Sequence, residues 1–146
     1  MHIKIMKVKG YEDLPTPRYM TSGSAGMDLY AAINGSYRLK PGERGLISTG
    51  IHLEIPEGFE AQIRPRSGLA INSGITLLNT PGTIDSDYRG ELKVIMINLS
   101  SETFTIKKGD RIAQIVFNKI ELPSIEVVES IEGSERGSAG FGSTGK

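Results

Sequence analysis

At 146 residues, the chain is long enough for one domain with its own buried core. Its 17 lysine and arginine residues balance its 17 aspartate and glutamate residues, so no overall charge draws it to nucleic acid or to a membrane surface. The absence of cysteine excludes disulfides, thiolate zinc sites and cysteine nucleophiles, and the 2 histidines leave few ligands for a transition metal.

Nearly every periodic segment alternates apolar and polar residues with the period of a β-strand. The first strand is predicted over residues 2–8, and the prolines within residues 11–19 predict a connecting loop. Short strands punctuated by Pro and Gly turns follow over residues 37–65, a pattern typical of a sandwich, jelly roll or barrel. His2 and His52 lie at the terminus and on the polar side of a strand, so we expect both at the surface rather than in catalysis.

The N-terminus lacks the pattern of a signal peptide, and no apolar run reaches the length of a bilayer span. We therefore expect a cytoplasmic protein that binds neither membrane nor nucleic acid. Residues 21–32 pass from a loop of small residues into a short strand that carries Asp28 between Met27 and Leu29. Burial of such an acid is costly unless it is paired or bound to a cation, so a buried Asp28 would have a partner. The alternative is that Asp28 faces solvent on an edge strand.

Residues 65–70 (PRSGLA) predict a short helical turn with Ser67 as its N-cap. A helix start presents free N–H groups and a positive dipole end, and Arg66 adds charge, so this segment favours a phosphate. The alternative is a capping serine with a purely structural role. We do not expect Ser67 to act as a nucleophile, because no histidine lies nearby in the sequence.

Residues 75–78 predict a strand that ends at Asn79. The Asn79 amide offers the donor and acceptor needed to bind a pyrimidine edge, or else it forms a turn. Residues 82–90 then carry two carboxylates, a phenol and a guanidinium between two glycines. If this stretch is extended, Asp85 and Asp87 point to one side, where they could hold a metal or activate water. The alternative is an ordinary polar turn.

Strands are predicted over residues 91–99, 103–106 and 111–117. The last is apolar apart from Arg111 and Gln114. A buried amide needs partners, so Gln114 either binds backbone groups or faces a ligand.

The composition changes after Val128, and residues 132–146 are rich in glycine without apolar periodicity. We therefore divide the chain into a domain over residues 1–131 and a flexible segment over residues 132–146. That segment carries a charge, a ring and two hydroxyls that suit it to close over a small anionic, aromatic ligand; they belong to Arg136, Phe141, Ser143 and Thr144. A disordered terminus is the alternative.

Five segments, in this order, resemble the trimeric dUTP pyrophosphatase (dUTPase) family; they are residues 25–31, 65–70, 82–90, 111–114 and 136–145. The resemblance implies an all-β, distorted jelly-roll subunit with at most one short helix. It also implies a homotrimer with active sites at the subunit interfaces. The implied reaction is magnesium-assisted hydrolysis of dUTP to dUMP and pyrophosphate, which limits uracil in DNA and supplies dUMP for dTMP synthesis.

The resemblance also implies roles for individual residues. Asp85 would activate the water that attacks the α-phosphorus, and Asp28 would act on Mg²⁺ through water. Asn79 would bind the uracil edge, and Tyr88 would stack under the deoxyribose and refuse a 2′-hydroxyl. The remaining implied substrate-binding residues are Arg66, Ser67, Gly68, Gly82, Thr83, Ile84, Lys93, Gln114, Arg136, Phe141, Gly142, Ser143 and Thr144.

Two positions depart from the family pattern. Ala139 stands where the family usually has glycine, and Thr80 where a serine is frequent. Neither change removes a chemical group, although the methyl group of Ala139 restricts the path of the tail. Two other functions stay open: a dCTP deaminase, alone or coupled to hydrolysis, and a dUTP-sensing interaction module. The Tyr-Arg-Gly ending of the third segment favours the hydrolase.

Overall fold

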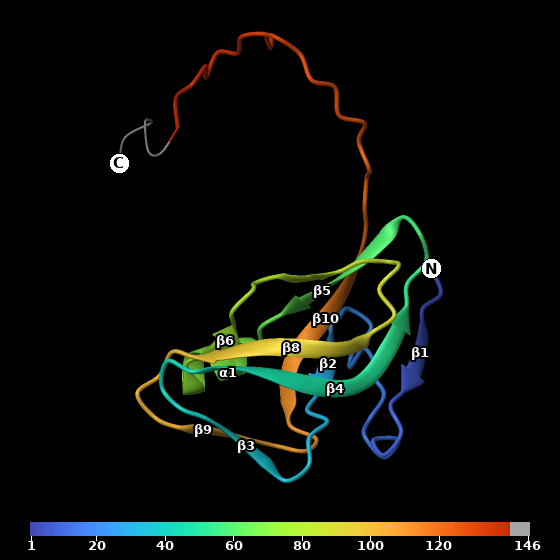
Figure 1. Cartoon of the computed structure of the whole chain (residues 1–146), viewed down its shortest axis with the longest axis vertical. Coiled ribbons are helices and arrows are strands. Elements are labelled where there is room, and N and C mark those ends of the chain that lie inside the picture. The colour runs from blue at the N-terminus through green and yellow to red at the C-terminus, as the bar shows by residue number, and fades with distance from the viewer. Residues whose placement is uncertain (141–146) are drawn as a thin grey trace.

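Two four-stranded antiparallel sheets form the body of the computed structural model, which describes residues 1–140 (Figure 1). The first sheet has the order β1 (Lys4–Lys7), β4 (Arg44–Glu54), β8 (Glu91–Asn98), β6 (Ile75–Leu77). The second has the order β2 (Met27–Tyr30), β10 (Arg111–Lys119), β5 (Phe59–Arg64), β7 (Gly82–Ile84). A separate ribbon pairs β3 (Ser36–Leu39) with β9 (Phe104–Lys107). The expected all-β architecture is confirmed.

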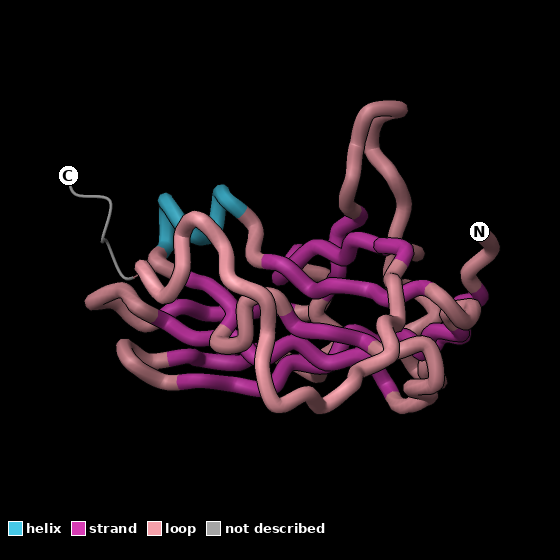
Figure 2. The backbone as a smooth tube through the Cα atoms, turned by 90° about the horizontal axis from the view of Figure 1, so that it is seen from above, coloured by secondary structure: helices cyan, strands magenta, loops and turns pink. Residues whose placement is uncertain are grey.

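One short helix, α1 (Ser67–Ser73), lies at one end of the strands (Figure 2). The prediction that Ser67 caps this helix is wrong. The carbonyl of Arg66 accepts the first helical bond, from the N–H of Ala70 at 3.0 Å, so Arg66 is the N-cap and Ser67 is the first helical residue. The helix ends at Gly74, whose left-handed φ of 62° suits a residue without a Cβ.

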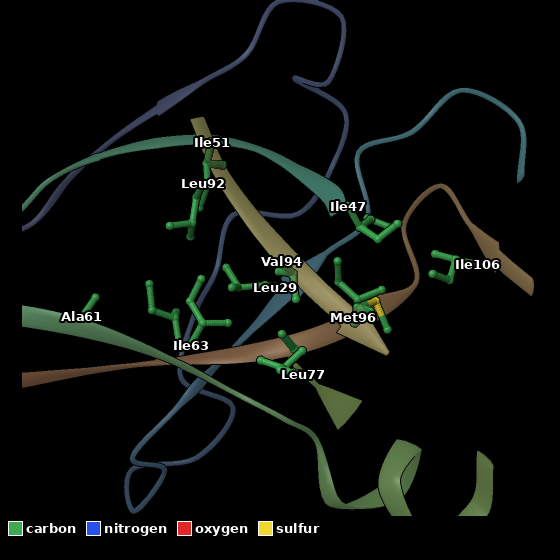
Figure 3. Close-up of a cluster of buried hydrophobic side chains, with 14 of the residues drawn as sticks. Leu29, Ile47, Ile51, Ala61, Ile63, Leu77, Leu92, Val94, Met96 and Ile106 are labelled. Atoms are coloured by element: carbon green, nitrogen blue, oxygen red, sulfur yellow. The ribbon is translucent and has the colours of Figure 1, made fainter. Parts of the chain in front are cut away.

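The hydrophobic core lies between the two sheets (Figure 3). Alternate residues of the strands point inward, as expected for sheets with one buried face. The first sheet contributes Ile47, Val94 and Met96, and the second contributes Leu29 and Ile63, all nearly inaccessible to solvent. Every buried side-chain nitrogen or oxygen of the described residues has a hydrogen-bond partner, so the core carries no unpaired polar group.

The outer face of the first sheet carries its own apolar side chains. Leu46 on β4 pairs with Ile95 on β8 and is 59% exposed. Leu78, whose N–H donates to the carbonyl of Ile95, is 49% exposed. We call Leu46, Leu78, Ile95 and Ile97 the outer apolar patch. A contiguous patch of this kind is typical of a protein interface.

The C-terminal part of the described chain runs away from the sheets (Figure 1). The last strand ends at Lys119, and residues 121–139 are all exposed. Within residues 1–140, no helix is both long and apolar enough to cross a membrane. The predicted boundary between residues 131 and 132 stays a prediction, and Phe141, Gly142, Ser143 and Thr144 lie outside the described residues.

Candidate active site

A cavity of about 320 Å³ lies beside β7 and β8. Its wall is apolar where it borders the core, with Ile63, Leu77 and Val94, and polar at its other side. Seven residues that the sequence singled out meet there: Asn79, Gly82, Thr83, Ile84, Asp85, Tyr88 and Lys93. An apolar cavity with a few converging polar groups is the usual form of a small-molecule site.

The Asn79 side chain stands at the wall of this cavity, close to the backbone of Gly82. A Cβ added at Gly82 would lie 3.0 Å from Nδ2 of Asn79, so glycine leaves the room that the amide needs. The hydroxyl of Thr80 donates to the carbonyl of Leu77 at 2.6 Å and fixes the turn; a serine hydroxyl would serve equally. Asn79 makes no side-chain hydrogen bond within residues 1–140, and its amide is therefore available to a ligand.

Asp85 and Asp87 lie in the connection between β7 and β8, two strands of different sheets. Strand β7 ends at Ile84, and a turn at residues 86–87 is closed by the N–H of Tyr88, which donates to the carbonyl of Asp85 at 3.2 Å. The chain is therefore not extended here, and the alternative of a polar turn is the form that the structure shows. Asp85 borders the cavity with Asn79 and also a second cavity, whereas Asp87 borders only the second.

The Tyr88 ring packs against the backbone that follows it. Its hydroxyl donates to the carbonyl of Glu91 at 3.1 Å. A Cβ added at Gly90 would overlap the Tyr88 hydroxyl and ring, so the glycine is required here for close approach rather than for an unusual φ. The ring is 46% exposed and can still offer one face to a ligand.

A second cluster of charged residues surrounds Asp28. Its carboxylate lies 2.9 Å from Nε of Arg66 and 3.3 Å from a terminal guanidinium nitrogen of Arg111. The Asp28 side chain is only 17% exposed, so the expectation that this acid needs a partner is confirmed. Gln114, opposite Asp28 in the β2–β10 ladder, donates to the carbonyl of Pro65 at 2.9 Å. Gln114 therefore binds a backbone group, which is one of the two alternatives predicted for it.

The described residues offer few direct ligands to a metal ion. Within residues 1–140, no three His, Cys, Asp or Glu side chains group closely enough to hold a metal ion. Asp28 already pairs with two guanidinium groups, one at each of its carboxylate oxygens. Mg²⁺ retains several waters and binds phosphates readily, so phosphate and water oxygens would supply most of its ligands. The role of Asp28 toward the ion stays a prediction.

Asp28→Asn is expected to lower the free energy of unfolding in metal-free buffer by about 1–3 kcal/mol, because two guanidinium groups lose their shared carboxylate. Urea denaturation with a chelator present measures this effect. The matched control is Asp13→Asn, which breaks the exposed 2.8 Å pair with Lys108 and should cost about 0–1 kcal/mol. Equal effects of the two variants would contradict a structural role for the Asp28 cluster.

Comparisons with known proteins identify the family of the chain. The family model described as dUTPase matches residues 12–145. The chain belongs to the dUTPase family. The predicted family membership and the predicted fold are thereby confirmed.

Two curated relatives bear the name deoxyuridine 5′-triphosphate nucleotidohydrolase. One, from Caldanaerobacter subterraneus, is 57% identical over 98% of this chain and 97% of its own length. Another, from Fusobacterium nucleatum, is 56% identical over 100% of this chain and 98% of its own length. Among solved structures, a mutant dUTPase of Staphylococcus bacteriophage 80alpha with dUpNHpp has a TM-score of 0.88 and 26% identity, covering 99% of both chains. A mutant dUTPase from phage phi11 of S. aureus, 24% identical with a TM-score of 0.79 and covering 89% of this chain and 98% of its own, coordinates a structural Mg(II) ion.

The structure places the predicted site residues in two groups. Asn79, Asp85 and Tyr88 border the cavity beside β7, whereas Asp28 on β2, Gln114 on β10 and Arg66 after β5 form the Asp28 cluster. β2 and β7 are the two edges of the second sheet, so Asp28 lies on the strand farthest from β7. Arg66 and Arg111 border a cavity whose lining does not include Asn79, Asp85 or Tyr88.

Several residues of the two groups were not predicted. Arg111 belongs to the fourth family segment, but its pairing with Asp28 depends on the β2–β10 register. The unpredicted cavity residues are apolar: Leu46, Ile63, Leu77, Val94 and Ile95. Strand alternation indicates which of these point inward, yet it does not show that β4, β5 and β8 would line the same cavity as Asn79.

Proposed function

We propose that this protein hydrolyses dUTP to dUMP and pyrophosphate at the cavity beside β7. The observation that carries the proposal is the convergence of Asn79, Asp85 and Tyr88 on one cavity of suitable size. It is supported by relatives that are more than half identical and are named for this hydrolysis. No observation on residues 1–140 favours a dCTP deaminase or a dUTP-sensing module.

Binding of the nucleoside would use the apolar and polar sides of the cavity together. The free Asn79 amide offers an N–H donor and a carbonyl acceptor, which match the acceptor and donor of a uracil edge. The exposed face of the Tyr88 ring would lie under the deoxyribose and leave no room for a 2′-hydroxyl. Gly82, Thr83 and Ile84 would add backbone groups, and Lys93 would bring a positive charge to the same cavity.

Asp85 would act as the general base. Its side chain is exposed and makes no hydrogen bond within residues 1–140, so its oxygens are free to contact a water molecule. It would accept a proton from a water molecule as the water oxygen attacks the α-phosphorus. The bond from the α-phosphorus to the bridging oxygen then breaks, and pyrophosphate leaves.

The phosphates would be held by the second cluster. Arg66, Ser67, Gly68 and Gln114 would bind phosphate oxygens near the start of α1, with Arg136, Phe141, Gly142, Ser143 and Thr144 closing from the tail. Magnesium, when bound with the nucleotide, neutralises phosphate charge and polarises the α-phosphorus. Arg66 is already oriented by its 2.9 Å pair with Asp28, so Asp28 would contribute by holding this guanidinium as well as by contacting the ion through water.

We further propose that the active site forms between subunits of a homotrimer. The support is the separation of the cavity from the Asp28 cluster within one chain. In a ring of identical subunits, the cavity of one chain can face the cluster of the next. The outer apolar patch borders the cavity through Leu46 and Ile95 and offers a surface for such an assembly.

A mixing experiment tests the shared site. Asp85→Asn and Arg66→Ala are each expected to be nearly inactive alone. Co-expressed in equal amounts, they should regain about a quarter of the wild-type rate of pyrophosphate release, because random assortment leaves that share of sites with both wild-type groups. Light scattering confirms the trimer mass of each sample. No recovery in mixed trimers would show that both groups act within one chain, and a monomer would overturn the proposed assembly.

A further inference from the structure

The strand β4 is irregular beside the turn at residues 85–90, between β7 and β8. It pairs with β8 along most of its length (Figure 1). The register shifts, however, between Ser48, opposite Lys93, and His52, opposite Glu91, so that three residues of β4 face the single residue Leu92. Gly50 in this bulge has a φ of +70°, which favours glycine. Bulges often lie beside active sites, where they redirect neighbouring side chains.

The Glu91 side chain fills this bulge. One of its carboxylate oxygens accepts a hydrogen bond from the N–H of Gly50 at 3.1 Å, and the other accepts one from the hydroxyl of Ser48 at 3.3 Å. The carbonyl of the same residue accepts the hydrogen bond from the Tyr88 hydroxyl. Glu91 therefore connects β4 directly to the ring that lines the cavity.

His52, at the end of the bulge, contacts the turn at residues 85–90. Its Nδ1 lies 2.9 Å from the carbonyl oxygen of Arg89. A carbonyl can only accept, so Nδ1 carries the proton and donates.

The other hydrogen bonds of residues 85–90 stay within the segment 82–91. The Arg89 guanidinium donates to the carbonyls of Ser86 and Tyr88, at 2.6 and 3.0 Å. These bonds stiffen the turn but do not attach it to the sheet. Within the described chain, His52 makes the only hydrogen bond that reaches residues 85–90 from outside the segment 82–91.

We propose that His52 and Glu91 are positioning residues that hold the Tyr88–Arg89 turn against β4 and so set the Tyr88 ring in the cavity. The catalytic consequence rests on the proposed role of Tyr88 at the sugar. A turn freed from β4 would let the ring move away from the deoxyribose. Discrimination between dUTP and UTP would then fall more than the turnover of dUTP.

The test compares His52→Leu with His52→Asn. Leucine fills similar space without a donor, whereas the asparagine amide places an N–H near the position of Nδ1. In His52→Leu we expect amide hydrogen exchange to accelerate in peptides covering residues 85–90 but not in the strands of the second sheet. The ratio of kcat/KM for dUTP to that for UTP should fall about fivefold, which is the effect expected when one hydrogen bond is lost. His52→Asn should restore both readouts.

The two readouts separate the possible failures. Unchanged exchange at residues 85–90 in His52→Leu would overturn the positioning role, as would equal effects of leucine and asparagine. Faster exchange with an unchanged dUTP to UTP ratio would uphold positioning and contradict the role of Tyr88 at the sugar. Tyr88→Ala, measured with the same two nucleotides, checks that role independently.

Discussion

Asp85→Asn is expected to lower kcat for dUTP hydrolysis by a factor of about 10²–10⁴, the usual contribution of a general base. The amide keeps the shape of the carboxylate but cannot take a proton from the attacking water. Because the Asp85 side chain makes no hydrogen bond within residues 1–140, the substitution should not disturb the fold. Binding of a non-hydrolysable dUTP analogue should persist. Pyrophosphate release and calorimetric titration measure the two properties.

Asp87→Asn is the matched control. It removes the same charge two residues away, on an acid that borders the second cavity but not the cavity with Asn79. Its kcat should stay near the wild-type value. A fully active Asp85→Asn variant would show that the base is elsewhere. An Asp87→Asn variant that loses as much activity as Asp85→Asn would show that only the local negative charge matters.

Deletion of residues 132–146 is expected to lower kcat/KM for dUTP by about 10²-fold or more, since it removes the charge, ring and hydroxyls proposed to close the site. The melting temperature should stay unchanged. The reason is that residues 132–139 are exposed, whereas the core lies between strands that end at Lys119. Steady-state kinetics and a thermal melt test both expectations.

Arg136→Ala in the full-length chain is the companion variant, because it removes one phosphate-binding charge and keeps the tail. We expect it to raise KM with a smaller loss than the deletion causes. A truncated protein that unfolds or changes its mass in solution would contradict a closing role, since the tail would then support the fold or the assembly. An unchanged kcat/KM after truncation would contradict it as well.

The sequence alone determined the fold class and the chemical groups of the site. Alternation with a period of two is a local property, and it indicated strands such as β5 and β8 together with their buried faces. The family resemblance likewise indicated Asn79, Asp85 and Tyr88, which border one cavity in the structure. The fold-class prediction succeeded because alternation depends on residues close to one another in the chain.

Only the tertiary structure decided how those groups are arranged. The partners of Asp28, the separation of the site into two groups and the contact of His52 with Arg89 all join residues far apart in the sequence. Each depends on strand order and register, which local patterns do not encode. The turn that separates Asp85 from Asp87 was likewise undetermined, because Asp, Ser and Gly suit an extended loop and a tight turn equally. The same residues took one of these forms because β7 and β8 belong to different sheets and the chain must cross between them.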